Sequence, residues 1–156
     1  MNQEYFAMND KKQENPVEKV KVGDTLIGKM TLIVPEDRYF VLVEDYLPAG
    51  LEGVDFSLQT SQQSLSDTMQ ESGDNPCMGS YSWDCWLETW RFNHNEVRDD
   101  RMMFSADFLP QGVYELKYVV RATSPGTFHD LPAMASEWYF PEVFGRSSGR
   151  MFVIEQ

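Results

Sequence analysis

Histidine is scarce in this sequence, and so are the motifs that usually accompany catalysis. The 156 residues include two histidines, His94 and His129, which lie far apart and lack a metal-binding spacing. The Gly-x-Ser-x-Gly motif of hydrolases and the glycine-rich motifs of nucleotide-binding proteins do not occur. We therefore expect no enzyme activity, no metal and no cofactor, with His94 on a strand and His129 in a loop.

Basic residues are also few. Thirteen lysines and arginines against 25 aspartates and glutamates give a net charge of −12 and an isoelectric point near 4.4. Nucleic acids and anionic membranes both attract cationic surfaces, so neither is an expected partner. No apolar run reaches the roughly 18 residues that a membrane-spanning helix needs, so we expect no insertion into a membrane.

Cysteine occurs only as Cys77 and Cys85, in one polar stretch without a Cys-x-x-Cys motif. Because disulfides persist in exported proteins, we predict a local disulfide between them if the protein is exported. Two free thiols are the alternative. Met1 to Pro16 lacks the apolar segment of a signal peptide, so an exported protein would have its natural start upstream of Met1.

Acidic side chains gather at Glu96, Asp99, Asp100 and Asp107. A pair of carboxylates can hydrolyse glycosides, which makes this group a candidate for catalysis. However, Asp99-Asp100 lies between two predicted strands, and aspartate favours turns because its side chain accepts hydrogen bonds from nearby backbone N–H groups. We interpret the group as part of a turn.

Short runs of β-branched and aromatic residues, separated by proline and glycine, make up most of the remaining chain. Between residues 113 and 121, Tyr114, Leu116, Tyr118 and Val120 alternate with charged residues, which predicts a strand with one buried face. Similar runs predict strands over residues 17–22, 25–34, 38–46, 86–97, 101–108 and 151–154. The sequence therefore predicts an all-β fold, a single antiparallel β-sandwich over residues 17–156.

Three stretches do not fit the strand pattern. Residues 1–16 are polar and are expected to form a flexible lead-in. Residues of about 57–85 are rich in Ser, Gln, Asp and Gly, which predicts a long polar insertion in the sandwich. Residues 122–149 contain several prolines and glycines and are expected to be a loop-rich excursion before the last strand.

Aromatic residues are dense between Trp138 and Phe144, in a segment bounded by proline and glycine. Two interpretations compete. The segment could fold over an open end of the sandwich, which is the commoner fate of large rings and the interpretation that we favour. Alternatively, it presents rings to a neighbouring domain, since aromatics are enriched in interfaces. The contact surface would then comprise Trp138, Tyr139, Phe140, Glu142, Phe144 and Arg146.

Several segments together resemble a known family. The run from Val41 to Glu52 looks like a strand and turn of the terminal domain of bacterial α2-macroglobulins. The segments 95–101, 108–114 and 118–128 resemble that domain in the same order and spacing, as do residues 131–135 and 139–147. Within them, Arg-Ala-Thr-x-Pro-Gly-x-Phe and Pro-Glu-Val-x-Gly-Arg are the most specific pieces.

The resemblance implies a macroglobulin-like sandwich, the last domain of a large exported protein that traps proteases. In that family a protease cuts a bait segment, the molecule rearranges, and a thioester in another domain can bond the protease. The resemblance also implies a periplasmic or extracellular location. Direct partners would be neighbouring domains of the same polypeptide, above all the thioester domain, and proteases would be engaged only through the parent.

This sequence departs from the family in two respects. The thioester signature Cys-x-Glu-Gln is absent, since Cys77 precedes Met-Gly-Ser and Cys85 precedes Trp-Leu-Glu. The polar insertion has no counterpart in the family pattern that we can align. A different class of function also remains open, because β-sandwiches serve many roles. It is an immunoglobulin-like adhesion or ligand-binding module of a cell-surface protein.

Overall fold

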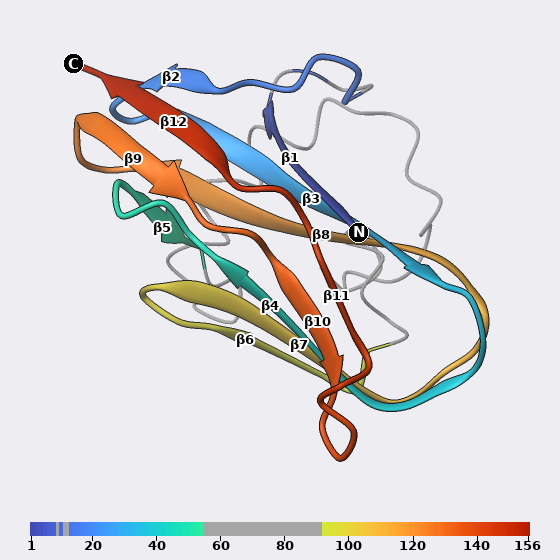
Figure 1. Ribbon diagram of the computed structural model, residues 1–156. Helices are drawn as coiled ribbons and strands as arrows, with labels where there is room; N and C mark the ends of the chain where they lie inside the picture. Colours follow the sequence, from blue (N-terminus) through green and yellow to red (C-terminus); the bar gives the residue numbers. More distant parts are fainter. Residues whose placement is uncertain (9, 11–12, 55–91) are drawn as a thin grey trace, which may run out of the picture.

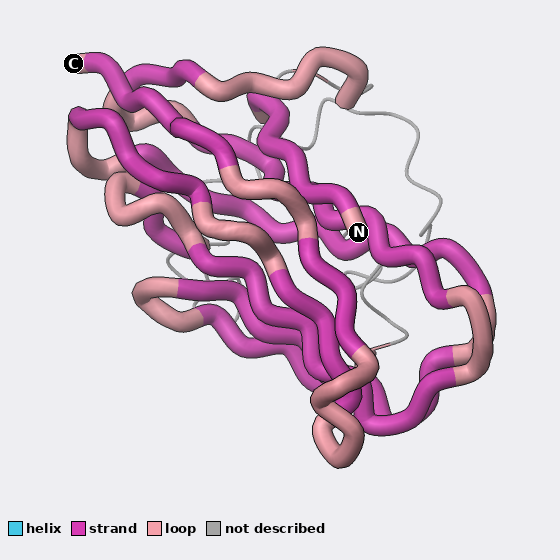
Figure 2. Tube along the Cα trace, in the orientation of Figure 1, coloured by secondary structure: helices cyan, strands magenta, loops and turns pink. Residues whose placement is uncertain are grey.

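The computed structural model describes residues 1–8, 10, 13–54 and 92–156, and these form a two-layer β-sandwich (Figures 1 and 2). One layer is a four-stranded sheet in the order β1-β3-β8-β5. Its strands are β1 (Asn2–Ala7), β3 (Thr25–Val34), β5 (Leu51–Gly53) and β8 (Gly112–Ala122). The central pair, β3 and β8, is antiparallel along its whole length, from Thr25 opposite Arg121 to Val34 opposite Gly112.

The second layer consists of two sheets. A five-stranded sheet has the order β11-β10-β4-β7-β6, and a three-stranded sheet has the order β2-β12-β9. Their strands are β2 (Lys19–Lys21), β4 (Arg38–Tyr46), β6 (His94–Val97), β7 (Arg101–Leu109), β9 (Gly126–Asp130), β10 (Met134–Glu137), β11 (Phe144–Arg146) and β12 (Arg150–Glu155). The sheets are antiparallel except that β2 pairs with β12 in parallel.

One long hairpin joins the two sheets of the second layer. β9 and β10 form one arm, β11 and β12 form the other, and the register of the two arms is the same in both sheets. Between the sheets the arms stay linked, because Ser147 N donates to Ala133 O and Ala133 N donates to the Ser147 hydroxyl, each at 2.9 Å. Figure 1 shows the tip of this hairpin, between β10 and β11, projecting beyond the other strands.

The core lies between the layers and follows the two-residue period of the strands. On β4 the inward positions are Val41, Val43 and Asp45, and on β7 they include Met102 and Phe104. These face a second set from the four-stranded sheet: Tyr5, Leu26, Met30, Leu32, Val34, Leu116, Tyr118 and Val120. In the described residues, no helix is long and apolar enough to cross a membrane.

Most of the strongly patterned strands are confirmed. β3 and β4 have the predicted bounds, and β7, β8 and β12 differ by a residue or two at their ends. The turn at Asp99-Asp100 is also confirmed, because Arg98 N donates to Arg101 O at 2.9 Å between β6 and β7. Of the strand predicted over 86–97, residues 86–91 lie outside the described residues.

Three predictions are wrong. Residues 2–7 are not a flexible lead-in but β1, which pairs with β3 and buries Tyr5 and Phe6. Residues 122–149 contain β9, β10 and β11, because these short segments obtain their hydrogen bonds from each other, from β4 and from β12. His129 consequently lies on β9 rather than in a loop. The polar insertion, with Cys77 and Cys85, falls within residues 55–91 and lies outside the described part of the chain.

Candidate functional site

Among the described residues, seven aromatic side chains are exposed at one end of the sandwich. They come from the start of β4, the end of β7, and the segment that runs from the β10–β11 loop into β11. Each of these residues exposes between 43% and 67% of its surface to solvent. We call this surface the aromatic end; its residues are Tyr39, Phe40, Phe108, Trp138, Tyr139, Phe140 and Phe144. Burial of the 138–144 segment over the sandwich, the interpretation favoured from the sequence, is therefore wrong.

Backbone and ring contacts hold the loop against β4. Trp138 N donates to Phe40 O at 2.8 Å, and the rings of Phe40 and Tyr139 meet edge to face with centroids 5.1 Å apart. Tyr39 lies opposite Phe108 in the β4–β7 ladder, and their ring centroids are 5.0 Å apart. Aromatic pairs of this kind add about 0.5–1.5 kcal/mol to the effect of burial, so the exposed rings have preferred positions.

Phe40 has an unusual backbone. Its φ angle is +51°, in the left-handed region that residues other than glycine rarely adopt. The neighbouring side chains Tyr39 and Phe40 are both exposed at this point of β4, whereas consecutive strand residues normally point to opposite faces. Such strain costs roughly 1–3 kcal/mol and is concentrated at functional sites, which supports a role for this surface.

A tight turn closes the tip of the hairpin. Val143 N donates to Phe140 O at 2.8 Å, with Pro141 and Glu142 between them, and Glu137 N donates to Val143 O at 3.2 Å. Proline favours the second position of such a turn because its ring fixes φ. Glu142 is exposed at the outermost part of the turn. The turn therefore exposes both the Glu142 carboxylate and the ring of Phe140.

The aromatic end continues onto the outer face of the five-stranded sheet. Phe144 and Arg146 are both exposed and lie opposite Ser136 and Met134 of β10, so all four belong to that outer face. A groove of about 370 Å³ runs across the same region, lined by β4, β6 and β7 residues and by two rings of the tip; among its residues are Phe40, Leu42, His94, Met103, Trp138 and Tyr139.

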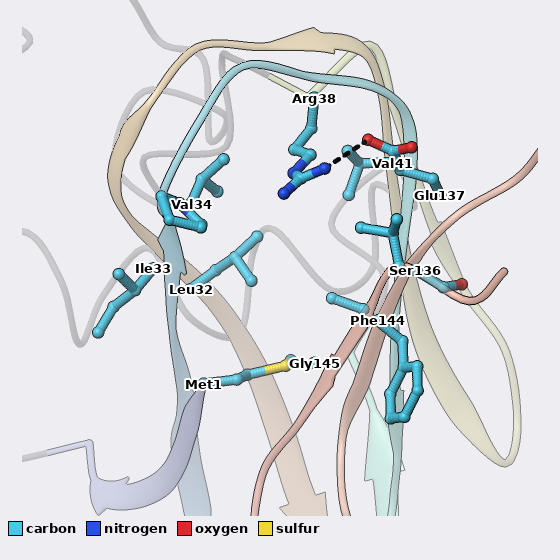
Figure 3. Close-up of a pocket in the computed structure, with 13 residues that line it drawn as sticks. Met1, Leu32, Ile33, Val34, Arg38, Val41, Ser136, Glu137, Phe144 and Gly145 are labelled. Carbon is cyan, nitrogen blue, oxygen red and sulfur yellow. Dashed lines mark ion pairs between the residues drawn. The ribbon is translucent and has the colours of Figure 1, made fainter. Parts of the chain in front are cut away.

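A second groove lies on the other side of the hairpin, between the two layers (Figure 3). Its volume is about 160 Å³, and Leu32 and Val34 of β3 lie across it from Gly145 of β11, while the ring of Phe144 points away from it. Arg38 and Glu137 form an ion pair of 3.7 Å at its upper end in Figure 3. The β10–β11 hairpin thus borders a hollow on each of its sides.

Two of the acidic residues considered for catalysis, Glu96 and Asp100, bind arginines, and Asp107 accepts a hydrogen bond from Asn93. Hydrogen bonds from Arg98 lower the pKa of Glu96, and hydrogen bonds from Arg101 lower the pKa of Asp100. Both carboxyl groups are on the surface. In the described part of the chain, no group of histidine, cysteine and acidic residues has the arrangement of a metal site.

Comparison with known proteins places this sandwich in a family. The model of the bacterial alpha-2-macroglobulin MG10 domain matches residues 1–142. The chain belongs to the bacterial α2-macroglobulin family. An α2-macroglobulin homologue from Nostoc sp. is 33% identical over 127 residues, which are 81% of this chain and 6% of the relative. An α2-macroglobulin from Xylella fastidiosa is 27% identical over 132 residues, or 85% of this chain and 7% of the relative.

Solved α2-macroglobulins have the same fold. The structure of native Escherichia coli α2-macroglobulin from domain MG7 to the C-terminus matches 99% of this chain with a TM-score of 0.73 at 19% identity, and the chain covers 23% of it. Salmonella α2-macroglobulin reacted with methylamine matches 99% of this chain with a TM-score of 0.71 at 20% identity, over 9% of its own length. This MG10 domain therefore spans a small fraction of the α2-macroglobulins that it matches.

The sequence located part of this surface. All six residues predicted as a contact surface in the MG10 domain, including Glu142 and Arg146, are exposed. Tyr39, Phe40 and Phe108 were missed, because they fall inside predicted strands. The adjacent rings of Tyr39 and Phe40 break the alternation of a half-buried strand, and this irregularity was the available signal.

Proposed function

We propose that this MG10 domain is an accessory domain of an exported protease-trapping inhibitor, located in the periplasm or outside the cell. The aromatic end packs against the thioester domain of the same polypeptide and helps to hold the untriggered state. The observation that carries this proposal is the exposure of seven aromatic rings on one end of an otherwise well-packed sandwich. Exposed apolar patches of this kind are typical of interfaces.

Three further features support a contact with another domain. The chain spans 6–7% of the curated α2-macroglobulins described above, so most of the parent is available as a partner. The positive φ of Phe40 costs free energy in the isolated domain, and strained residues of this kind are concentrated at functional sites. Glu142 and Arg146 add charges of opposite sign to the aromatic surface, which suits a rim of polar contacts around an apolar centre.

The test uses the full-length parent carrying Tyr139→Ala and Phe144→Ala together. Truncating an interface aromatic costs roughly 1–3 kcal/mol or more where the ring is well packed, so opening of the untriggered state should rise about tenfold or more. We expect faster loss of the thioester to methylamine before any protease is added. We also expect a smaller fraction of trypsin to be trapped.

A matched control is available on the opposite layer. Ile33 and Val113 are exposed to a similar degree, 63% and 66%, and lie opposite each other on β3 and β8. Ile33→Ala with Val113→Ala should leave thioester lifetime and trapping unchanged. If the aromatic variant has the same thioester lifetime and trapping as the control, the domain does not hold the untriggered state. The role as an adhesion or ligand-binding module then becomes the better hypothesis.

A further inference from the structure

A cluster of polar side chains is buried between the two layers, separate from the aromatic end. At its centre, Gln3 Nε2 of β1 lies 2.7 Å from Oδ1 of Asp45 on β4 and 3.2 Å from Oδ1 of Asp130 on β9. The Tyr118 hydroxyl of β8 donates to the second oxygen of Asp45. The exposed fraction is 0% for Asp45 and 2% for Asp130, so both carboxyl groups are inside the protein.

Among the described residues, Arg150 is the one cation that acts on these two carboxyl groups. Arg150 Nε of β12 donates to Oδ2 of Asp130 at 3.0 Å, and the guanidinium carbon lies 5.4 Å from the ring centre of Tyr5. The charged and titratable groups that act on Asp45 are thus Asp130, Arg150 and the tyrosines of β1 and β8. Ionising both carboxyl groups leaves one uncompensated negative charge in a medium of low dielectric constant, which is unfavourable.

The protonation equilibria reflect this imbalance. The pKa of Asp45 is raised to about 7, chiefly by burial; the hydrogen bond from Tyr118 opposes the rise, the charge of Asp130 adds to it, and Arg150 and Gln3 oppose it. Burial also raises the pKa of Asp130, against the hydrogen bond from Arg150. The pair therefore holds a proton at mildly acidic pH that an exposed pair would release.

β1 covers this cluster and is an edge strand. It pairs with β3 on one side and is the last strand of the four-stranded sheet, with a backbone hydrogen bond on its other edge, from Val17 N to Tyr5 O at 2.7 Å. It nevertheless contributes Gln3 and Tyr5 to the cluster. In the described part of the chain, the buried Oε1 atom of Gln3 has no hydrogen-bond partner. The amide nitrogen of Gln3, by contrast, donates to both carboxyl groups, so β1 is tied directly to the pair.

We propose that β1 is a latch whose closure is coupled to the binding of one proton by the Asp45–Asp130 pair. When β1 leaves the sheet, water reaches the pair and restores its ordinary acidity, so opening of the latch releases the proton. The latch is therefore tightest below neutral pH and loosens as the pH rises. This property belongs to the interior of the domain and does not depend on the role of the aromatic end.

Hydrogen exchange of the β1 amides in this chain tests the proposal. After correction for the intrinsic rate, the opening equilibrium of β1 should rise by up to tenfold per pH unit from about pH 5 to about pH 7 and then level off. The β1 amides should also open more often than those at the centre of β8. A flat profile for β1, or identical opening of β1 and β8, would refute the latch.

Asp45→Asn identifies the proton site. This variant should remove most of the pH dependence of β1 opening, because only Asp130 then remains to titrate beside Arg150. Asp99→Asn, in the exposed β6–β7 turn, should retain the wild-type profile. Retention of the profile in Asp45→Asn would overturn the assignment. Tyr118→Phe provides a second variant that conserves the ring. Loss of its hydroxyl removes a hydrogen-bond donor that favours ionised Asp45, so the pH above which β1 opening no longer increases should be higher than in wild type. An unchanged pH profile contradicts the proposal.

Discussion

Gly28 marks a place in β3 where a side chain cannot be accommodated. It lies opposite Tyr118 of β8 and Tyr5 of β1, and an alanine Cβ at this position would lie 2.7 Å from the Tyr118 hydroxyl oxygen and closer still to its ring. The ring is fully buried and is held by its hydrogen bond to Asp45, so it cannot move without loss. Overpacking costs about 1–3 kcal/mol and a hydrogen bond to a charged group about 1.5–3 kcal/mol. We expect Gly28→Ala to lower the free energy of unfolding by about 3–5 kcal/mol.

Urea unfolding followed by circular dichroism measures this loss. Gly145→Ala is the matched control, because an added Cβ there meets no atom within 4 Å, and its effect should stay within about 0.5 kcal/mol. In a Tyr118→Leu background, most of the Gly28→Ala penalty should disappear, since the obstructing ring is gone. A Gly28→Ala protein within about 1 kcal/mol of wild type would refute the reasoning.

Two further predictions concern the global stability of the domain. Because the folded-state pKa of Asp45 is raised to about 7, its contribution to stability is fully present below its ordinary pKa near 4 and is lost as the pH rises through about 7. One pKa unit corresponds to 1.36 kcal/mol, so between about pH 4 and pH 8 the free energy of unfolding of wild type should fall by as much as about 4 kcal/mol relative to that of Asp45→Asn. Parallel curves of unfolding free energy against pH for the two proteins would contradict this. At the aromatic end, Phe40→Gly should be less destabilising than Tyr39→Gly by about 1 kcal/mol, because glycine adopts a positive φ without strain. If urea titrations give the reverse order, the backbone at Phe40 is not strained.

The strands that could be predicted are those whose pattern depends on the hydrophobic core alone. In β3 and β4, apolar residues occupy the inward positions over most of the strand, and proline or glycine turns bound them. β1 escaped prediction because Gln3, one of its inward residues, is polar: it binds two buried carboxyl groups. A polar residue that is satisfied inside the core cannot be distinguished in the sequence from one that faces water.

The short strands of the long hairpin were missed for another reason. β10 and β11 contain three or four residues each, with few β-branched side chains, and they exist because β4 and the opposite arm supply hydrogen-bond partners. Such partners are distant in sequence, so local composition cannot reveal them. The buried carboxyl of Asp45 did leave a signal, since Val41, Val43 and Asp45 share the inward period of β4.

The unchanged register of the long hairpin restricts how this domain can vary among its relatives. Adding or deleting one residue in either arm would turn every later side chain of that arm to the opposite face, moving Phe144 and Arg146 inward or Ala135 outward. The turn at Pro141-Glu142 carries no such restriction, because in the described part of the chain neither of its two central residues belongs to a strand ladder. Insertions and deletions among relatives should therefore be confined to the tip. The residues that the tip presents to a partner can then differ between relatives while the length of the arms stays the same.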